Sequence, residues 1–255
     1  MTNISLSLII ATYQSGNCLA DCLQSVSNLM LPEHMTLEVI IIDGGSTDET
    51  MSIVNSFSNV VSKSISEKDS GIYDAWNKGI KVSTGDWIMF IGSDDTLLPN
   101  ALAIYGKCID KNKNVDYISS KVNLVDFEGN FLQTVGNRFS WLKFKRYMTV
   151  AHVGSIHNRK LYDEIGLYNL DYKICGDYEL LLRKGSELNT IFINEVTANM
   201  RIGGISYSSI DALVETRYAK LTHNVVGKLV AWHDYYWAVL KMYVRRYVEG
   251  ISNAK

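Results

Sequence analysis

The stretch that decides the fold is "GDWIMFIGSDD", residues 85–95. Its apolar run, residues 87–91, has the length and composition of a buried strand. The run ends at a pair of neighbouring carboxylates, Asp94 and Asp95. Like charges at the tip of a strand repel one another, and any loss of solvent raises the cost of keeping both ionised. We therefore expect a positively charged group to lie between them.

Similar apolar runs precede this one and alternate with helical patterns. Residues 4–12, 37–43 and 60–66 are expected to form strands. Helices are expected near residues 18–26, from a capping box formed by Ser46 and Glu49, over residues 72–82, and from Pro99 to about residue 109. This alternation predicts a doubly wound parallel α/β layer over residues 1–120.

The pattern changes to α+β after residue 115. A hairpin is expected over residues 115–135, with short helices near residues 160–165 and 178–186. A strand at residues 190–197, a Gly-rich loop at residues 201–209 and one long helix from residue 210 to about 249 follow. We predict one unit over residues 1–208, divided near residue 120, and a C-terminal helical extension over residues 209–255.

Composition limits the classes of function. A 255-residue chain that is 47% hydrophobic can form a large core, and a net charge of −2 argues against a protein that coats nucleic acid. The four cysteines match no zinc, haem or disulfide pattern. The N-terminus has no basic region before its apolar run, so we expect no signal peptide and a cytoplasmic location.

Polar residues follow each predicted parallel strand. Thr12 and Tyr13 follow the first, Asp43 the second, residues 66–71 the third, and the aspartate pair the fourth. Ligands bind at this edge of open parallel sheets. There is no G-x-G-x-x-G after the first strand and no P-loop, which argues against a dinucleotide or a P-loop nucleotide site. Carboxylates at this edge favour Mn²⁺ or Mg²⁺, which would in turn bind a substrate diphosphate.

Four segments together resemble one known family. They are "LSLIIATYQSGNCLADCLQSV", "EVIIIDGGSTDET", "SEKDSGIYDAWNKGIKVSTGDWIMFIGSDD" and "GDYELLLR". Their order and spacing over roughly residues 5–185 resemble glycosyltransferase family 2, the inverting transferases of the GT-A fold. The resemblance implies a Rossmann-like, mostly parallel sheet flanked by helices, with an acceptor-side α+β part. It also implies a UDP-sugar donor and a divalent cation.

The resemblance assigns roles position by position. Residues matching nucleotide-binding positions are Thr12, Tyr13, Asp43, Asp69, Asn77 and Asp94, and residues 71–77 together resemble a motif that lines the nucleotide. Among them, Asp43 would contact the base and Asp94 would lie nearer the ribose. Asp95 matches the metal ligand and Asp177 the catalytic base, with Glu179 as the alternative base. The chain departs from the family at Gly44, Ser93 and Gly176, positions at which many members carry an acid.

Several of these residues also have purely structural interpretations. Asp43 could cap a turn, and Asp177 could be the N-cap of its helix. Arg183 lies four residues after Glu179 and is expected to pair with it along one helix. His152 and Arg201 could contact donor phosphate or acceptor, or could belong to ordinary loops.

The C-terminal segment is basic and aromatic. Six basic residues and one acid lie between residues 217 and 248, together with Trp232, Tyr236, Trp237 and Tyr243. Charges interrupt the apolar residues too often for a membrane span. The pattern suits a helix lying on an anionic membrane, and equally one packed on the catalytic unit or on the second copy of a homodimer.

These expectations combine into one hypothesis. The chain would be an inverting glycosyltransferase that moves a hexose from a UDP-sugar to a saccharide acceptor. We expect this acceptor to be lipid-diphosphate-linked and to belong to bacterial polysaccharide biosynthesis such as O-antigen assembly. The chain would work in the cytoplasm at the inner membrane, without nucleic acid. The alternatives are a sugar nucleotidyltransferase and a non-catalytic nucleotide-sugar-binding module. A nucleotidyltransferase should have a Gly-rich loop with Arg or Lys after the first strand, and "ATYQSGN" is not such a loop.

Overall fold

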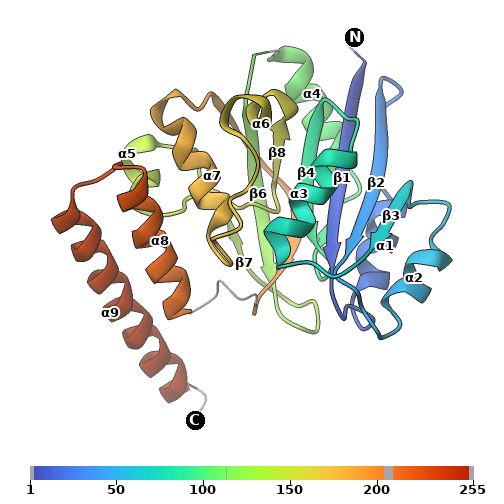
Figure 1. Ribbon diagram of the computed structural model, residues 1–255. Coiled ribbons are helices and arrows are strands. Elements are labelled where there is room, and N and C mark those ends of the chain that lie inside the picture. Colours follow the sequence, from blue (N-terminus) through green and yellow to red (C-terminus); the bar gives the residue numbers. More distant parts are fainter. Residues whose placement is uncertain (1–2, 113, 204–208, 253–255) are drawn as a thin grey trace.

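A single curled sheet forms the centre of the molecule (Figure 1). The computed structural model describes residues 3–112, 114–203 and 209–252. Its strands are β1 (Ile4–Thr12), β2 (Met35–Asp43), β3 (Lys63–Ser66), β4 (Trp87–Gly92), β5 (Thr96–Leu97), β6 (Tyr117–Val125), β7 (Phe131–Val135), β8 (Ser155–Asn158) and β9 (Thr190–Arg201). They lie in the order β3-β2-β1-β4-β8-β6-β9-β5, and β7 pairs with β6.

The first four strands in that order are parallel, as the sequence predicts. Thr12 lies opposite Asp43, and Asp43 lies opposite Ser66. Ala11 lies opposite Gly92 at the end of β4. The carboxyl ends of these strands therefore meet at one edge, which is the edge where ligands bind in open parallel sheets.

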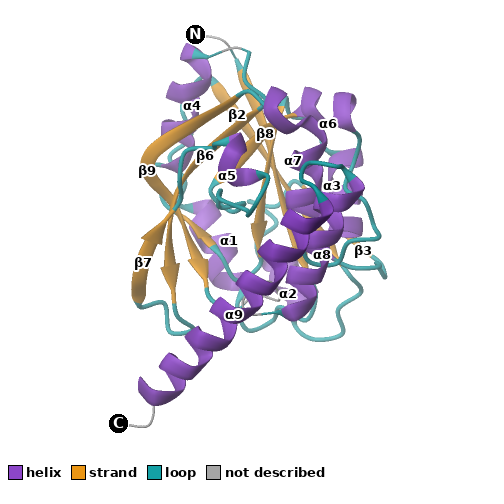
Figure 2. Ribbon diagram, turned by 90° about the vertical axis from the view of Figure 1, so that its left-hand side faces the viewer, coloured by secondary structure: helices purple, strands orange, loops and turns teal. Residues whose placement is uncertain are grey.

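Helices cover both faces of the sheet (Figures 1 and 2). The helices α1 (Leu19–Ser27), α2 (Thr50–Ser56) and α4 (Ala101–Lys111) share a core with one face. The helices α3 (Ile72–Val82), α6 (Arg159–Ile165) and α7 (Gly176–Lys184) share a core with the other. Alternate residues of β1 point to the two sides, since Leu8 belongs to the first core and Ile9 to the second. Burial on both faces explains why these strands read as continuous apolar runs.

The second half of the sheet is mixed. The predicted hairpin is confirmed as β6 and β7, and β9 lies parallel to β6. Three short elements, β5, β8 and α5 (Trp141–Phe144), were not predicted. The longest of them has four residues, too few to show any periodicity. Of the predicted Gly-rich loop, residues 204–208 lie outside the described residues.

Two predicted helix boundaries are wrong. The helix α2 begins at Thr50 and not at Ser46, because the Ser46 hydroxyl donates to Asp43 at 2.5 Å. The predicted long C-terminal helix is two helices, α8 (Ile210–Thr222) and α9 (Lys228–Ser252). The break contains Asn224 with a φ of 51°, a left-handed conformation that Asn tolerates better than most residues.

The helix α9 is tied to the rest of the protein through Asp234, which is 1% exposed. Arg146 donates to both of its carboxylate oxygens, and the Nζ of the buried Lys220 lies 3.0 Å from one of them. Burial would raise the pKa of Asp234, but the bonds from Arg146 and Lys220 lower that pKa to about 2. Among the described helices, none has both the length and the apolar character needed to cross a membrane.

The first prediction concerns this anchor. Asp234→Ala leaves the Lys220 ammonium buried without a counter-charge, so the free energy of unfolding should fall by about 3–5 kcal/mol in urea denaturation. Asp234→Ala combined with Lys220→Met should recover most of that loss. Asp211→Ala, at an exposed acid of α8, should change stability by less than about 0.5 kcal/mol. Equal losses in the two single variants would contradict the anchor.

Candidate active site

A cleft of about 570 Å³ opens at the carboxyl end of β4. Five of the residues singled out from the sequence line part of its wall: Asp94, Asp95, His152, Asp177 and Arg201. They come from the turn after β4, the loop before β8, the start of α7 and the end of β9. The fold thus brings together residues that are up to 107 positions apart in the sequence.

Asp95 is the buried member of the aspartate pair, with 5% of its surface exposed. One of its oxygens accepts from the Gly92 amide at 3.1 Å and the other from the Arg201 amide at 3.0 Å. Burial raises the pKa of Asp95, the neighbouring charge of Asp94 raises it further, and the pKa reaches about 7. The hydrogen bonds from the two backbone amides and the charge of Arg201 act to lower the pKa of Asp95, but they do not cancel the rise.

Arg201 supplies positive charge near the aspartate pair. Arg201 lines the same cleft, and its Nε is buried without a hydrogen-bond partner among the described residues. The pKa of Asp95 nevertheless stays raised, so the arginine does not fully compensate the pair. Two carboxylates suit a hard divalent cation whose other ligands come from substrate and water. Within residues 3–112, 114–203 and 209–252 no group of three or more acids, histidines or cysteines could hold a metal alone.

Asp177 lies in the first turn of α7 and lines the cleft. One of its oxygens accepts from the Tyr178 amide at 2.8 Å and lies 3.4 Å from the Tyr73 hydroxyl, which also donates to the Ile174 carbonyl at 2.7 Å. The preceding residue is Gly176 because a Cβ there would lie 2.8 Å from the Tyr73 ring. The absence of the usual acid at this position is therefore a packing requirement.

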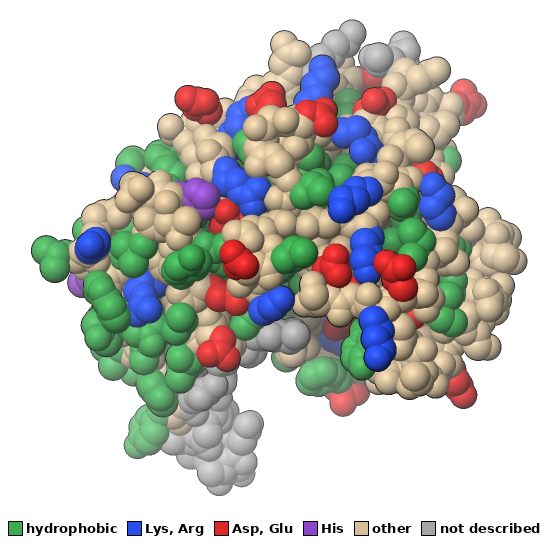
Figure 3. All heavy atoms as spheres, viewed as in Figure 1, with side chains coloured by type: hydrophobic (Ala, Val, Ile, Leu, Met, Phe, Trp, Pro, Cys, Tyr) green, Lys and Arg blue, Asp and Glu red, His purple; other side chains and the backbone are tan. Residues whose placement is uncertain are grey.

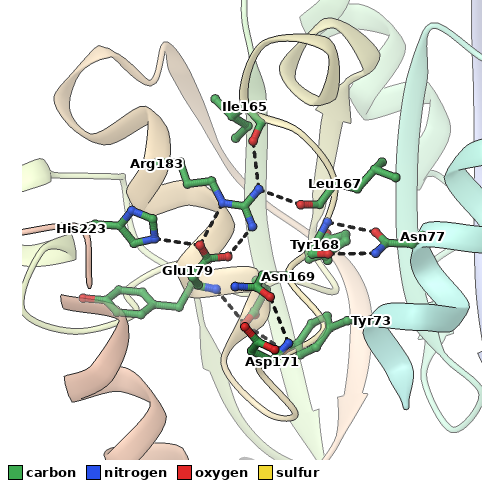
Figure 4. Close-up of polar contacts among 12 residues, drawn as sticks. Tyr73, Asn77, Ile165, Leu167, Tyr168, Asn169, Asp171, Glu179, Arg183 and His223 are labelled. Atoms are coloured by element: carbon green, nitrogen blue, oxygen red, sulfur yellow. Dashed lines mark hydrogen bonds and ion pairs between the residues drawn. The ribbon is translucent and has the colours of Figure 1, made fainter. Parts of the chain in front are cut away.

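A buried ion pair fixes α7, the helix that begins with Asp177 in its first turn (Figure 4). Arg183 donates to Glu179 at 2.9 and 2.5 Å, which confirms the predicted helical pair. His223 lies 2.7 Å from the same carboxylate. Arg183 also donates to the carbonyls of Ile165 and Leu167. Glu179 is 2% exposed and does not line the cleft, so the structure does not support it as the alternative base.

Asn77 is bonded to the loop that follows α6, the loop whose Leu167 carbonyl accepts from Arg183. Its amide nitrogen donates to the Tyr168 carbonyl and its oxygen accepts from the Tyr168 amide, both at 2.9 Å (Figure 4). Both ends of the side chain are therefore used within the protein, and Asn77 does not line the cleft. A contact between Asn77 and a nucleotide would require it to exchange one of these hydrogen bonds.

Asp43 lies at the predicted edge of the sheet but is fully buried. It accepts hydrogen bonds from Thr12, Gly45, Ser66 and, twice, from Ser46. Burial acts to raise the pKa of Asp43, but these bonds outweigh it and lower the pKa. The carboxylate thus joins three loops, and contact with a nucleotide base would require it to exchange one of these bonds.

Tyr13, Gly44 and Asp69 form a shelf at the same edge. A Cβ at Gly44 would lie 2.8 Å from the Asp69 carboxylate and 3.3 Å from the Tyr13 ring. Tyr13 is 66% exposed, so its ring is available to a ligand. The glycine that departs from the family pattern therefore leaves room between an aromatic ring and an acid.

His152 is held in the cleft by an aromatic stack. Its ring lies 4.6 Å from that of Trp76 at an interplanar angle of 9°. Burial lowers the pKa of His152, although Asp177 acts to raise it. The ring is therefore neutral near pH 7.

Tyr73 and Trp76, which lie in the predicted nucleotide-lining stretch 71–77, also line the cleft, as does Lys173, which was not predicted. The two aromatic residues lie three apart on α3, a spacing that indicates a helix face packed in the core. No local signal distinguishes such a face from one that borders a ligand site.

The chain is similar in sequence to known glycosyltransferases. Residues 7–158 match the family model of glycosyl transferase family 2. A PGL/p-HBAD biosynthesis glycosyltransferase of Mycobacterium tuberculosis is 32% identical over 212 residues, spanning 80% of each chain. The uncharacterized glycosyltransferase YwdF of Bacillus subtilis is 27% identical over 72% of this chain and 69% of its own.

Solved structures share the fold. TarS 1-349 of S. aureus in complex with UDP-GlcNAc has a TM-score of 0.71 at 17% identity, covering 89% of this chain and 69% of its own. The mannosyltransferase PcManGT of Pyrobaculum calidifontis, in complex with GDP-Man and Mn²⁺, has a TM-score of 0.68 at 16% identity, covering 94% and 73%. The GT-A fold expected from the sequence is confirmed.

The raised pKa of Asp95 predicts an unusual pH dependence. Between pH 4 and 7 the folded protein holds a proton that the unfolded chain releases, so stability should fall as pH rises through this range. From pH 5 to pH 8, with a chelator present, wild type should lose about 2–3 kcal/mol relative to Asp95→Asn. Asp69→Asn should keep the wild-type slope. Parallel profiles for wild type and Asp95→Asn would show that Asp95 does not titrate in this range.

Proposed function

The chain belongs to glycosyl transferase family 2 and is a glycosyltransferase, and on that premise we propose that it transfers a hexose from a UDP-sugar with inversion. The observation that carries the proposal is the placement of Asp177 in one cleft with Asp94 and Asp95. The pair marks where a donor diphosphate would bind, and Asp177 lies on a different element, at the start of α7.

Inversion needs a base on one face of the sugar and a leaving diphosphate on the other. Asp177 would take the proton of the acceptor hydroxyl, since a single positioned carboxylate suffices for this step. Its orientation is fixed by the Tyr178 amide and by the buried Glu179–Arg183 pair behind it. Arg201, whose Nε lacks a partner among the described residues, would bind the diphosphate.

Asp95, with Asp94 beside it, would hold a Mn²⁺ or Mg²⁺ ion, which when bound neutralises charge on the leaving diphosphate. The nucleoside would lie on the shelf formed by Tyr13, Gly44 and Asp69. Thr12, Asp43 and Asn77 would act indirectly, by holding the loops around that shelf and the cleft.

Replacing Asp177 tests the catalytic assignment. Asp177→Asn should lower kcat by about 10²–10⁴-fold, because the amide cannot accept the proton. UDP affinity, measured by titration calorimetry with Mn²⁺, should stay within about twofold of wild type. The control Asp171→Asn changes an exposed acid of a nearby loop and should leave both quantities unchanged.

The activity assay follows UDP release from UDP-glucose, UDP-galactose or UDP-GlcNAc with a lipid-diphosphate-linked sugar as acceptor. Full activity in Asp177→Asn would mean that another residue is the base. Binding of UDP without turnover of any donor would favour a non-catalytic binding module. Preferential binding of GDP would overturn the choice of donor.

We further propose that α8 and α9 rest on an anionic membrane, where a lipid-diphosphate-linked acceptor of bacterial polysaccharide assembly would be found. Hydrophobic side chains gather over these helices on the left of Figure 3. Exposed members on α9 are Leu229, Val230, Trp232, Tyr236, Trp237, Leu240, Tyr243, Val244 and Tyr247. Lys241 lies 5.3 Å from the Trp237 ring, so a cation accompanies the aromatic surface. Aromatic residues beside basic ones suit the interface of an anionic bilayer.

Flotation with liposomes tests this contact. Trp237→Ser combined with Lys241→Glu should weaken binding to vesicles containing anionic phospholipid by at least about tenfold. Phe131→Ser combined with Lys143→Glu removes an exposed aromatic residue of β7 and an exposed lysine of α5, and should bind like wild type. Equal binding by both variants would contradict the proposal. A dimer that the α9 variant alone disrupts would assign the surface to a second copy.

A further inference from the structure

A chain of imidazole and hydroxyl groups runs from the cleft into the core. The Nε2 of His152 lies 3.2 Å from the Tyr168 hydroxyl, which lies 3.4 Å from the Tyr162 hydroxyl. The Tyr162 hydroxyl lies 2.6 Å from the Nδ1 of His157. Tyr168, Tyr162 and His157 are all buried. Four groups from separate segments are thus joined, and only His152 reaches the cleft.

The far end of the chain sets its direction. The Nε2 of His157 is buried and has no hydrogen-bond partner among the described residues. Burial lowers the pKa of His157 well below its ordinary value, so the ring is neutral and has one N–H. An orphaned buried N–H is rarer in proteins than an orphaned acceptor. We infer that the proton of His157 lies on Nδ1 and is donated to the Tyr162 hydroxyl, 2.6 Å away.

The donor of each following hydrogen bond is then determined, because each hydroxyl has a single proton to donate. Tyr162 accepts from His157 and donates to Tyr168. Tyr168 in turn donates to the Nε2 of His152. His152 is neutral and accepts at Nε2, so its own proton lies on Nδ1.

We propose that His157, Tyr162 and Tyr168 are positioning residues that fix His152 as the Nδ1–H tautomer, so that the cleft presents a neutral N–H donor to a substrate oxygen. The stack on Trp76 fixes the plane of the ring. Because Nδ1 carries a proton and Nε2 is occupied by Tyr168, His152 cannot accept the proton of the acceptor hydroxyl. This hydrogen-bonded series thereby excludes His152 as the base and leaves Asp177 to accept the proton.

The substrate contact rests on the proposed transferase function, whereas the tautomer is a property of the free protein. It can be read from the ¹⁵N shifts of histidine-labelled protein, with His152 assigned by comparison with His152→Gln. Wild type should show a protonated Nδ1 and an unprotonated Nε2 at His152. Tyr162→Phe frees the Tyr168 hydroxyl to rotate, so both tautomers should become populated.

Tyr105→Phe is the matched control. It removes a buried hydroxyl that bonds Ser120 and Thr197 and is not part of the chain. Its His152 signals should match wild type. An Nε2–H tautomer in wild type, or identical His152 signals in wild type and Tyr162→Phe, would overturn the proposal.

Activity provides a second readout. Loss of one oriented hydrogen bond should lower kcat/KM by about 3–10-fold in Tyr162→Phe and in Tyr168→Phe. The double variant should fall no further than Tyr168→Phe alone, because both act through His152. Additive losses would overturn the coupling. If no UDP-sugar is turned over, the proposed function fails, while the tautomer experiment still decides this inference.

Discussion

The site depends on the in-register parallel pairing of β1 with β2 and β4. Thr12 opposite Asp43 and Ala11 opposite Gly92 bring three strand ends to one line. Hydrogen bonds from Thr12 and Ser46 to Asp43 then join the loops that leave these ends. A slip of one residue would turn every side chain of a strand to the other face, where it would meet a different set of helices. The apolar core thus fixes where the polar loops begin.

Aromatic residues between α3 and the loop before α7 position both Asp177 and His152. Tyr73 contacts Asp177 through its hydroxyl, and its ring stacks on Tyr168 at 5.4 Å. Tyr168 bonds His152 through its hydroxyl and Asn77 through its backbone. The acid at the start of α7 and the imidazole of the cleft therefore share one rigid support. A disturbance of Tyr168 would reach both.

The sequence predicts the parts of this molecule whose signals are local. Long apolar runs identify β1, β2 and β4, and their order predicts which edge carries the acids. Ser46 shows where local reasoning fails, since its hydroxyl is used by Asp43, 3 residues earlier, and not by the helix after it. The structural partners of Asn77 and Glu179 could not be predicted for a similar reason. Their partners, Tyr168 and His223, come from segments whose position no local pattern reveals.

The charges in the cleft explain why the aspartate pair is retained at a cost in stability. Asp94, Asp95 and Asp177 line the cleft with two basic residues, Arg201 and Lys173, and burial together with the charge of Asp94 keeps the pKa of Asp95 raised. In the proposed function a donor diphosphate would add further negative charge to this space, and additional positive charge would favour its entry. A cation that arrives with the donor would supply that charge and would ionise Asp95 fully. The same carboxylate that weakens the free protein would then make donor binding depend on the cation.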